Sequence, residues 1–170
     1  MKWAFLVVGI IAGLVVLVAL IGAMLPQRHH ATRKARYQVA PGALYAVLAG
    51  APDWRTGVKS FGALPDESGR KRWWEEDTHG QKITYELVED TPPSKLAVRI
   101  ADRGLPFGGT WTFEIVPEGS GAVLRITEDG EVYNVIFRFM ARFVFGYTGS
   151  IETYLKDLGA KFGQAVTIEA

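Results

Sequence analysis

The sequence predicts an α+β domain in which an antiparallel sheet of about six to seven strands is covered on one side by a long C-terminal helix. Three observations lead to this prediction. Residues 70–131 contain five strand-length runs in which apolar and polar residues alternate, a period typical of half-buried strands. Residues 134–162 repeat their apolar side chains every three or four positions, as one helical face does. Residues 3–25 form an uncharged stretch that is long enough to span a membrane.

The N-terminal stretch from Trp3 to Leu25 contains no charged or strongly polar side chain. At about 1.5 Å per residue, a helix of this length crosses a hydrocarbon core of roughly 30 Å. A cleaved signal peptide is the alternative, but its apolar region is normally only about 7–15 residues long. We therefore expect residues 1–26 to be a retained anchor and residues 27–170 to form the folded domain. Basic residues are more numerous after the span than before it, which predicts a domain on the cytoplasmic side.

The folded part begins with a strand and a short helix. Residues 31–39 have the length of a strand, and Pro41 then fits the first turn of a helix that ends before Gly50. The strands expected next cover residues 58–64, 70–77, 81–89, 95–102, 109–116 and 122–131. Because the connections between them are short, neighbouring strands are expected to be antiparallel. Alternation places their aromatic and aliphatic side chains on one face of the sheet.

The long C-terminal helix has signals at both ends. Asn134 is expected to be its N-cap, and Gly163 stands where a glycine ends a helix. Gly146 and Gly149 weaken the middle, so one kinked helix and two joined helices both remain open.

The first half of this helix carries aromatic residues on one side and arginines on the other, from Phe137 to Phe143. Such a pattern is typical of an interfacial helix that contacts lipid. Packing of the aromatic side on the sheet explains the same pattern, and we expect that arrangement.

Composition excludes several classes of site. The chain has no cysteine, so disulfides and thiolate metal ligands are absent. Its formal net charge is only +1, whereas proteins that bind nucleic acid usually carry a clear excess of basic residues. We therefore expect no nucleic-acid partner. His29 and His30 are adjacent and His79 is distant, which is not the spacing of a metal site. We therefore expect no metal and no cofactor, and we interpret the histidine pair as juxtamembrane polarity.

The order of these elements resembles the helix-grip fold of the START-like, or SRPBCC, superfamily, which includes polyketide cyclase/dehydrase and lipid-transport proteins. The residues that carry the resemblance are Pro41–Leu48, Asp53–Arg55, Gly109–Glu114, Leu124–Val132, Phe137–Phe139 and Tyr154–Leu158. The resemblance covers about residues 31 to 163. The chain is similar in organisation to the membrane-anchored bacterial members of the superfamily, which have one N-terminal span. It implies a curved sheet wrapped around the C-terminal helix, with an apolar cavity between them. The superfamily has no fixed catalytic set, so the resemblance assigns no catalytic residue.

The apolar sheet face is either a filled core or the wall of a ligand cavity. A face of this kind taken alone is usually core, because protein interiors are close-packed. The resemblance favours a cavity that binds an apolar small molecule or lipid. The candidate ligand-binding residues are Tyr85, Trp111, Phe113, Phe143 and Tyr147 along the cavity, Trp54 and Trp73 near its mouth, and Glu128.

Glu128 is the one acid of its strand whose parity points inward, together with Leu124 and Ile126. An unpaired buried charge is very costly, so this carboxylate needs a partner. We expect Glu128 to pair with water or with an arginine, either Arg138 or Arg142.

No nucleophile with an acid–base partner stands out in the sequence, so we expect a binding module and not an enzyme. Two alternatives remain open. One is a polyketide cyclase-like enzyme, and the other is a membrane-associated interaction domain with a filled core.

Overall fold

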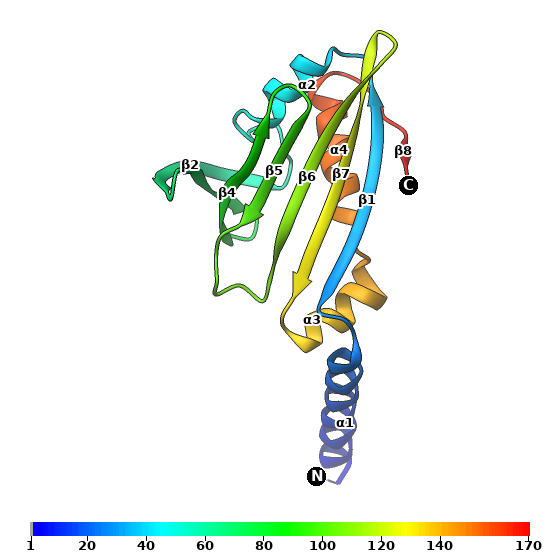
Figure 1. Cartoon of the computed structure of the whole chain (residues 1–170). Coiled ribbons are helices and arrows are strands. Elements are labelled where there is room, and N and C mark those ends of the chain that lie inside the picture. Colours follow the sequence, from blue (N-terminus) through cyan, green and yellow to red (C-terminus); the bar gives the residue numbers. More distant parts are fainter. Residues whose placement is uncertain (1) are drawn as a thin grey trace.

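The computed structural model describes residues 2–170 and contains an N-terminal helix followed by an α+β domain (Figure 1). The elements are α1 Lys2–Met24, β1 Arg28–Tyr37, α2 Pro41–Leu48, β2 Val58–Glu67, β3 Arg70–Asp77, β4 Lys82–Thr91, β5 Lys95–Ile100, β6 Phe107–Glu118, β7 Gly121–Val132, α3 Val135–Met140, the π-helix η1 Ala141–Phe145, α4 Gly149–Lys161 and β8 Ile168–Glu169.

One curved sheet contains eight strands in the order β2-β3-β4-β5-β6-β7-β1-β8, and all neighbours are antiparallel. This confirms the predicted sheet and the predicted strand β1, which pairs along its whole length with β7. The sequence did not predict β8, because two residues are too few to show an alternating pattern.

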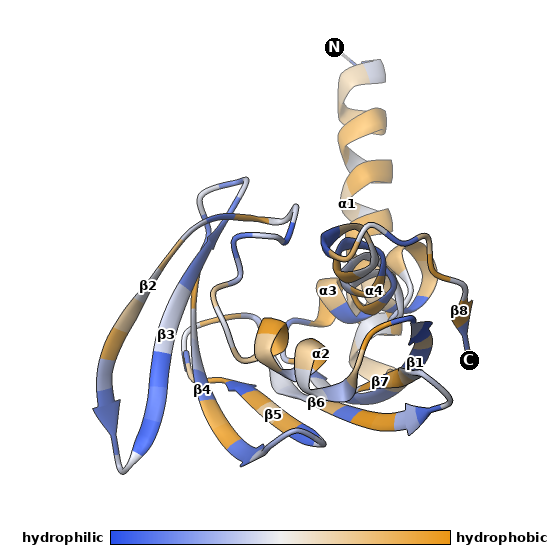
Figure 2. Ribbon diagram, turned by 90° about the horizontal axis from the view of Figure 1, so that it is seen from above, coloured by the Kyte–Doolittle hydropathy of each residue, from blue (hydrophilic) through white to orange (hydrophobic). Residues whose placement is uncertain are grey.

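The hydrophobic core lies where α4 crosses the inner faces of β6, β7 and β1. Figure 2 shows α4 inside the curve of the sheet near β7 and β1, while β2 and β3 curl away on the other side. The largest fully buried side chains are Tyr37, Leu44, Leu124, Ile126, Ile151, Leu155 and Leu158. The hydroxyl of Tyr37 also donates to the carbonyl oxygen of Leu155 at 2.8 Å, which fixes α4 against β1. The two layers therefore meet over only part of the sheet.

The predicted long helix is divided into two helices, the second of the two arrangements that the glycines left open. Gly146 has a φ of 73°, in the left-handed region that favours glycine, and it separates η1 from α4. The predicted ends are confirmed. The Asn134 side chain accepts hydrogen bonds from the backbone amides of Ile136 and Phe137 at 2.9 and 3.1 Å, and Gly163 follows α4 with a φ of 66°.

The expected packing of the aromatic half-helix on the sheet is wrong. Helix α3 packs instead against the C-terminal end of α1, and Figure 1 shows α3 next to that upper end of α1. Gly22 permits this approach, because a Cβ at that position would overlap the carbonyl group of Val135. Arg138 completes the junction by donating to the carbonyl oxygens of Val132 at 2.8 Å and of Leu25 at 3.3 Å.

Candidate functional site

A cavity of about 1240 Å³ lies on the concave side of the sheet and is lined by strands β1 to β7, the end of α2, η1 and α4. Small-molecule sites typically have volumes of roughly 300–1,000 Å³, so this space can hold a ligand of considerable size. The cavity exists because α4 covers β6, β7 and β1 while β2 to β4 curve away from it (Figure 2).

The exposure of the inward residues changes along the sheet. Phe113 and Ile126, on the strands below α4, are 4% and 0% exposed. Tyr85 and Ile100, on β4 and β5, are only half-buried, and both line the cavity. Phe61 on β2 lines the cavity as well and remains 42% exposed. The apolar face is therefore core at one end and cavity wall at the other.

The structure brings most of the predicted ligand-binding residues together. Those that line the cavity are Trp54, Trp73, Tyr85, Trp111, Phe113, Glu128 and Tyr147. They belong to the loop after α2, to β3, β4, β6 and β7, and to the segment before α4. Their contact with a ligand stays a prediction.

Phe143 is placed differently from the prediction. Its side chain is 60% exposed and packs on Phe139, with ring centroids 5.0 Å apart. The cause is that α3 and η1 pack beside α1, so the aromatic side of this segment does not face the sheet. Phe145, two residues later, lines the cavity in its place.

Aromatic rings form the floor of the cavity around Tyr154 of α4. Trp54 and Trp111 both meet the Tyr154 ring edge-on, with centroid distances of 5.1 and 5.7 Å. Farther along, Trp73 stacks on Tyr85 at 5.8 Å. Such rings offer a large apolar surface to a ligand and lose little conformational freedom on binding.

An ion pair between Arg55 and Glu75 lies in the cavity wall, and sequence reasoning missed it. Arg55 Nη1 is 2.7 Å from Glu75 Oε2, and the Glu75 side chain is only 9% exposed. The indole nitrogen of Trp73 donates to the other Glu75 oxygen at 3.0 Å. A signal was present, because Trp73 and Glu75 are two residues apart on one strand and must share its inner face.

His29 is also part of the cavity wall, so the interpretation of this residue as juxtamembrane polarity is wrong. Its ring stacks on Tyr147 with centroids 4.1 Å apart, and its Nε2 lies 3.5 Å from Glu128 Oε1. Gly130 lies opposite His29 on β7, where a Cβ would overlap the imidazole ring. The glycine therefore makes room for the inward histidine. His30 points outward and pairs with Asp129 at 2.8 Å.

The inward parity predicted for Glu128 is confirmed, since the residue lies opposite Trp111 and lines the cavity. The expected arginine partner is wrong. Arg138 is engaged by backbone carbonyl groups at the junction with α1, and Arg142 is exposed on η1. His29 reaches Glu128 instead, because β1 runs beside β7.

Burial changes the acidity of the phenols near the cavity. It raises the pKa of Tyr85 to about 12 from an ordinary value of 10.0, and the Glu75 carboxylate adds to the effect. Burial likewise raises the pKa of Tyr154, while the Arg55 guanidinium opposes that rise. Both phenols therefore remain neutral hydrogen-bonding groups at physiological pH.

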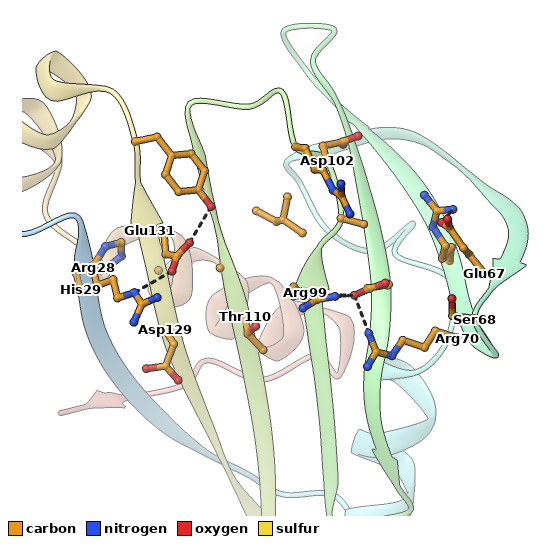
Figure 3. Close-up of a pocket in the computed structure, with 18 residues that line it drawn as sticks. Arg28, His29, Glu67, Ser68, Arg70, Arg99, Asp102, Thr110, Asp129 and Glu131 are labelled. Carbon is orange, nitrogen blue, oxygen red and sulfur yellow. Dashed lines mark hydrogen bonds and ion pairs between the residues drawn. The ribbon is translucent and has the colours of Figure 1, made fainter.

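A second concave region, of about 1190 Å³, is lined mainly by charged side chains (Figure 3). Five arginines there face five carboxylates, so the region has no net formal charge. Four of its five arginines are engaged in ion pairs, such as Arg28–Glu131 at 3.0 Å and Arg70–Glu86 at 3.3 Å. Arg99, labelled in Figure 3, also donates to Glu86, with its Nε at 2.7 Å. Most of its arginines are thus satisfied within the region itself, so we take the apolar cavity as the candidate functional site.

No cluster of three or more histidine, cysteine, aspartate or glutamate side chains suited to a metal ion occurs within residues 2–170.

Comparison with known proteins identifies the fold. Norcoclaurine synthase from Thalictrum flavum superimposes with a TM-score of 0.61 at 10% identity, over 81% of this chain and 88% of that chain. The di-domain ARO/CYC protein StfQ of the steffimycin biosynthetic pathway gives 0.63 at 14% identity, over 79% of this chain but only half of its own length. Protein MLL2253 from Mesorhizobium loti gives 0.60 at 14% identity, over 79% and 97% of the two chains. No protein-family model and no curated protein sequence matches this chain.

These likenesses show that the α+β part of this chain adopts the helix-grip fold, as the sequence resemblance implied. At such low identity they establish the fold alone.

Proposed function

We propose that this chain is a membrane-tethered binding module for a hydrophobic small molecule or lipid, held in the cavity between the sheet and α4. The observation that supports the proposal most directly is the aromatic cavity of about 1240 Å³ on the concave side of the sheet. A stable domain usually fills such a space with its own side chains, because interiors are close-packed. The partly exposed apolar wall, with Phe61 and Tyr85 in it, is explained by an apolar occupant.

The cavity wall also suggests the chemistry of the occupant. Its apolar rings would bury a hydrophobic body at about 25 cal/mol per Å², offset by the costs of association. Several charged side chains line the wall, and two pairs of them meet there, the Arg55–Glu75 pair and the His29–Glu128 pair. An elongated apolar molecule that carries a hydrogen-bonding group fits this distribution better than a pure hydrocarbon.

The tether is α1, which is long and apolar enough to cross a membrane and has none of its hydrophobic window buried in the protein. We assign residues 3–25 to the bilayer and the folded domain to the cytoplasmic side. The basic residues that follow the span support this orientation, according to the positive-inside tendency.

Substitution of Trp111 by alanine tests the binding proposal. The full chain in phospholipid nanodiscs would be titrated with a fluorescent fatty-acid analogue, and the signal of empty nanodiscs would be subtracted. Loss of the Trp111 ring should raise the dissociation constant about tenfold, equal to roughly 1.4 kcal/mol. Val116→Ala is the control, because Val116 is 58% exposed and does not line the cavity. Equal affinities for wild type and Trp111→Ala would refute binding in this cavity.

A second function, a cyclase-like enzyme, is favoured by the His29–Glu128 pair. An imidazole beside a carboxylate in an apolar cavity is a suitable acid–base group for proton transfer at carbon next to a carbonyl. Stacking on Tyr147 holds the imidazole in place. Turnover of a polyketide-like poly-β-carbonyl substrate by the wild type, abolished in His29→Ala, would establish this function. Binding without turnover would leave the binding module.

A further inference from the structure

The segment from α3 to η1, residues 135–145, carries an apolar surface that no other part of the described chain covers. We call it the α3–η1 surface. Its exposed large side chains are Ile136 at 43%, Phe137 at 49%, Phe143 at 60%, Val144 at 58% and Phe145 at 66%. The surface of a soluble protein rarely has this many large apolar side chains exposed within eleven consecutive residues. Such patches usually mark contact with a partner or a membrane.

The position of this surface indicates which partner covers it. Helix α3 is fixed to the C-terminal end of α1 through the contact of Gly22 with Val135. Arg138 reinforces the junction with hydrogen bonds to carbonyl oxygens on both sides of it. If α1 spans the bilayer, the α3–η1 surface lies where the helix leaves it. The surface of the same bilayer that α1 crosses is therefore the partner next to the α3–η1 surface.

The side-chain pattern agrees with a lipid partner. Exposed phenylalanines and valine together with an exposed basic residue are typical of helices that lie in the membrane interface. Arg142 supplies the exposed basic group, and no ion pair involves it among residues 2–170. It can reach a lipid phosphate while the neighbouring phenylalanines enter the acyl region.

The same segment forms one wall of the cavity. Ala141 and Phe145 of η1, followed by Gly146 and Tyr147, line it. We propose that the α3–η1 surface lies in the membrane interface and that the cavity takes its apolar ligand from the bilayer, past η1. This inference rests on the proposed binding function and names the source of the ligand.

Labels at single positions test the docking of this surface. The chain has no cysteine, so one introduced cysteine can be labelled with a bimane fluorophore without altering others. Val144→Cys reports on the α3–η1 surface, and Val116→Cys is a matched control with the same residue type and the same 58% exposure. Leu14→Cys, in the middle of α1, reports on the tether. All three are measured in the full chain, reconstituted into phosphatidylcholine–phosphatidylglycerol nanodiscs.

The expected result is that doxyl-labelled lipids quench the label at 144, while aqueous iodide quenches the label at 116. A label at 144 that iodide reaches as well as it reaches 116 would overturn membrane docking. The label at Leu14 separates the two claims, since quenching there by doxyl lipid shows that the tether holds even where docking fails.

Photo-crosslinking tests the route of the ligand. A diazirine-labelled stearic acid is dissolved in the nanodisc bilayer, and the time course of crosslinks to cavity peptides and to α1 is followed by mass spectrometry. Val144→Asp should slow the labelling of the cavity about fivefold or more, because a carboxylate in the interface opposes contact with the bilayer. Val116→Asp, on the far end of the sheet, should leave the rate unchanged.

The outcomes of this experiment distinguish a failure of the binding proposal from a failure of the proposed entry route. Crosslinks to α1 without any to the cavity in the wild type would refute the proposed binding function. Crosslinks to both, at equal rates in Val144→Asp and Val116→Asp, would overturn entry past η1 while leaving ligand binding intact.

Discussion

At the scale of single residues, the cavity has an aromatic wall in which two charged pairs, Arg55–Glu75 and His29–Glu128, meet. The Arg55 guanidinium lies over the Tyr154 ring at 5.0 Å and pairs with Glu75, which is almost fully buried. Breaking a pair of this kind by removing one partner is costly, because the remaining charge loses its compensation. Glu75 is therefore a structural residue of the wall as well as a candidate contact for a ligand.

Glu75→Gln should lower the free energy of unfolding by about 1–3 kcal/mol, because Arg55 loses a charged hydrogen-bond partner inside the wall. The neighbouring residue provides the control. Glu76 faces the other side of β3 and pairs with exposed lysines, Lys59 at 3.4 Å and Lys82 at 3.8 Å, so Glu76→Gln should cost less than about 0.5 kcal/mol. Urea denaturation of the full chain compares the two. Equal effects would show that the Arg55–Glu75 pair does not stabilise the fold.

Because the phenol of Tyr85 is buried, we expect the stability of the fold to depend on pH in the alkaline range. Its pKa is raised by burial to about 12 in the folded state, against an ordinary value of 10.0. The unfolded chain then releases the proton first, so the contribution is complete below pH 10 and is lost as the pH rises toward 12. The expected slope is about 1.4 kcal/mol per pH unit within that window.

Tyr85→Phe has no proton to lose, so its free energy of unfolding should fall less steeply than that of the wild type between pH 10 and pH 12. Burial also raises the pKa values of Tyr37 and Tyr154, so both proteins lose stability and only their difference is informative. A difference that does not change with pH would contradict the burial of this phenol.

The residues of the site could be predicted only where strand parity decides them. Trp111, Phe113 and Glu128 face inward because alternation along β6 and β7 is regular. His29 was missed, since its environment depends on the pairing of β1 with a strand about one hundred residues later. Phe143 was misplaced for a related reason. Its helical periodicity shows an apolar side, but periodicity cannot tell whether that side meets the sheet or a membrane.

At the scale of elements, the break between η1 and α4 determines how the molecule is built. Had residues 135–161 formed one straight helix, the aromatic half would extend along the sheet. The left-handed Gly146 lets the chain turn, so α4 packs on the sheet while α3 packs on α1. The glycines indicated that a break was available, and the tertiary contacts decide that it occurs.

Gly22→Ala tests the junction between α1 and α3. A Cβ there would overlap the backbone carbonyl of Val135, which cannot move as a flexible side chain does, so the helices must separate. The expected cost is about 1–3 kcal/mol, as for other overpacked contacts. Gly13→Ala is the matched control in the same helix, where a Cβ meets no atom within 4 Å. Thermal unfolding in nanodiscs gives the comparison, and identical midpoints would show that the junction is not closely packed.

At the scale of the whole molecule, the sequence predicted the order of elements and the fold, because alternation, helical period and turn residues are all local signals. It did not predict how much of the concave face α4 would leave uncovered. That depends on how far β2 and β3 curl away from the core, and the alternation of side chains along a strand does not report this curvature (Figure 2). The cavity is therefore a property of the assembled sheet, and its proposed ligand is the central claim.

Native mass spectrometry of the full chain, released from nanodiscs under gentle conditions, tests this claim most directly. The wild type should retain an apolar molecule. Val98→Trp should lose it, because Val98 lines the cavity and the larger ring would fill part of the space. Val116→Trp, which adds the same ring outside the cavity, should retain the molecule and so controls for lipid held by α1. A wild type without any bound molecule, or a Val98→Trp variant that keeps it as well as Val116→Trp does, would contradict the account.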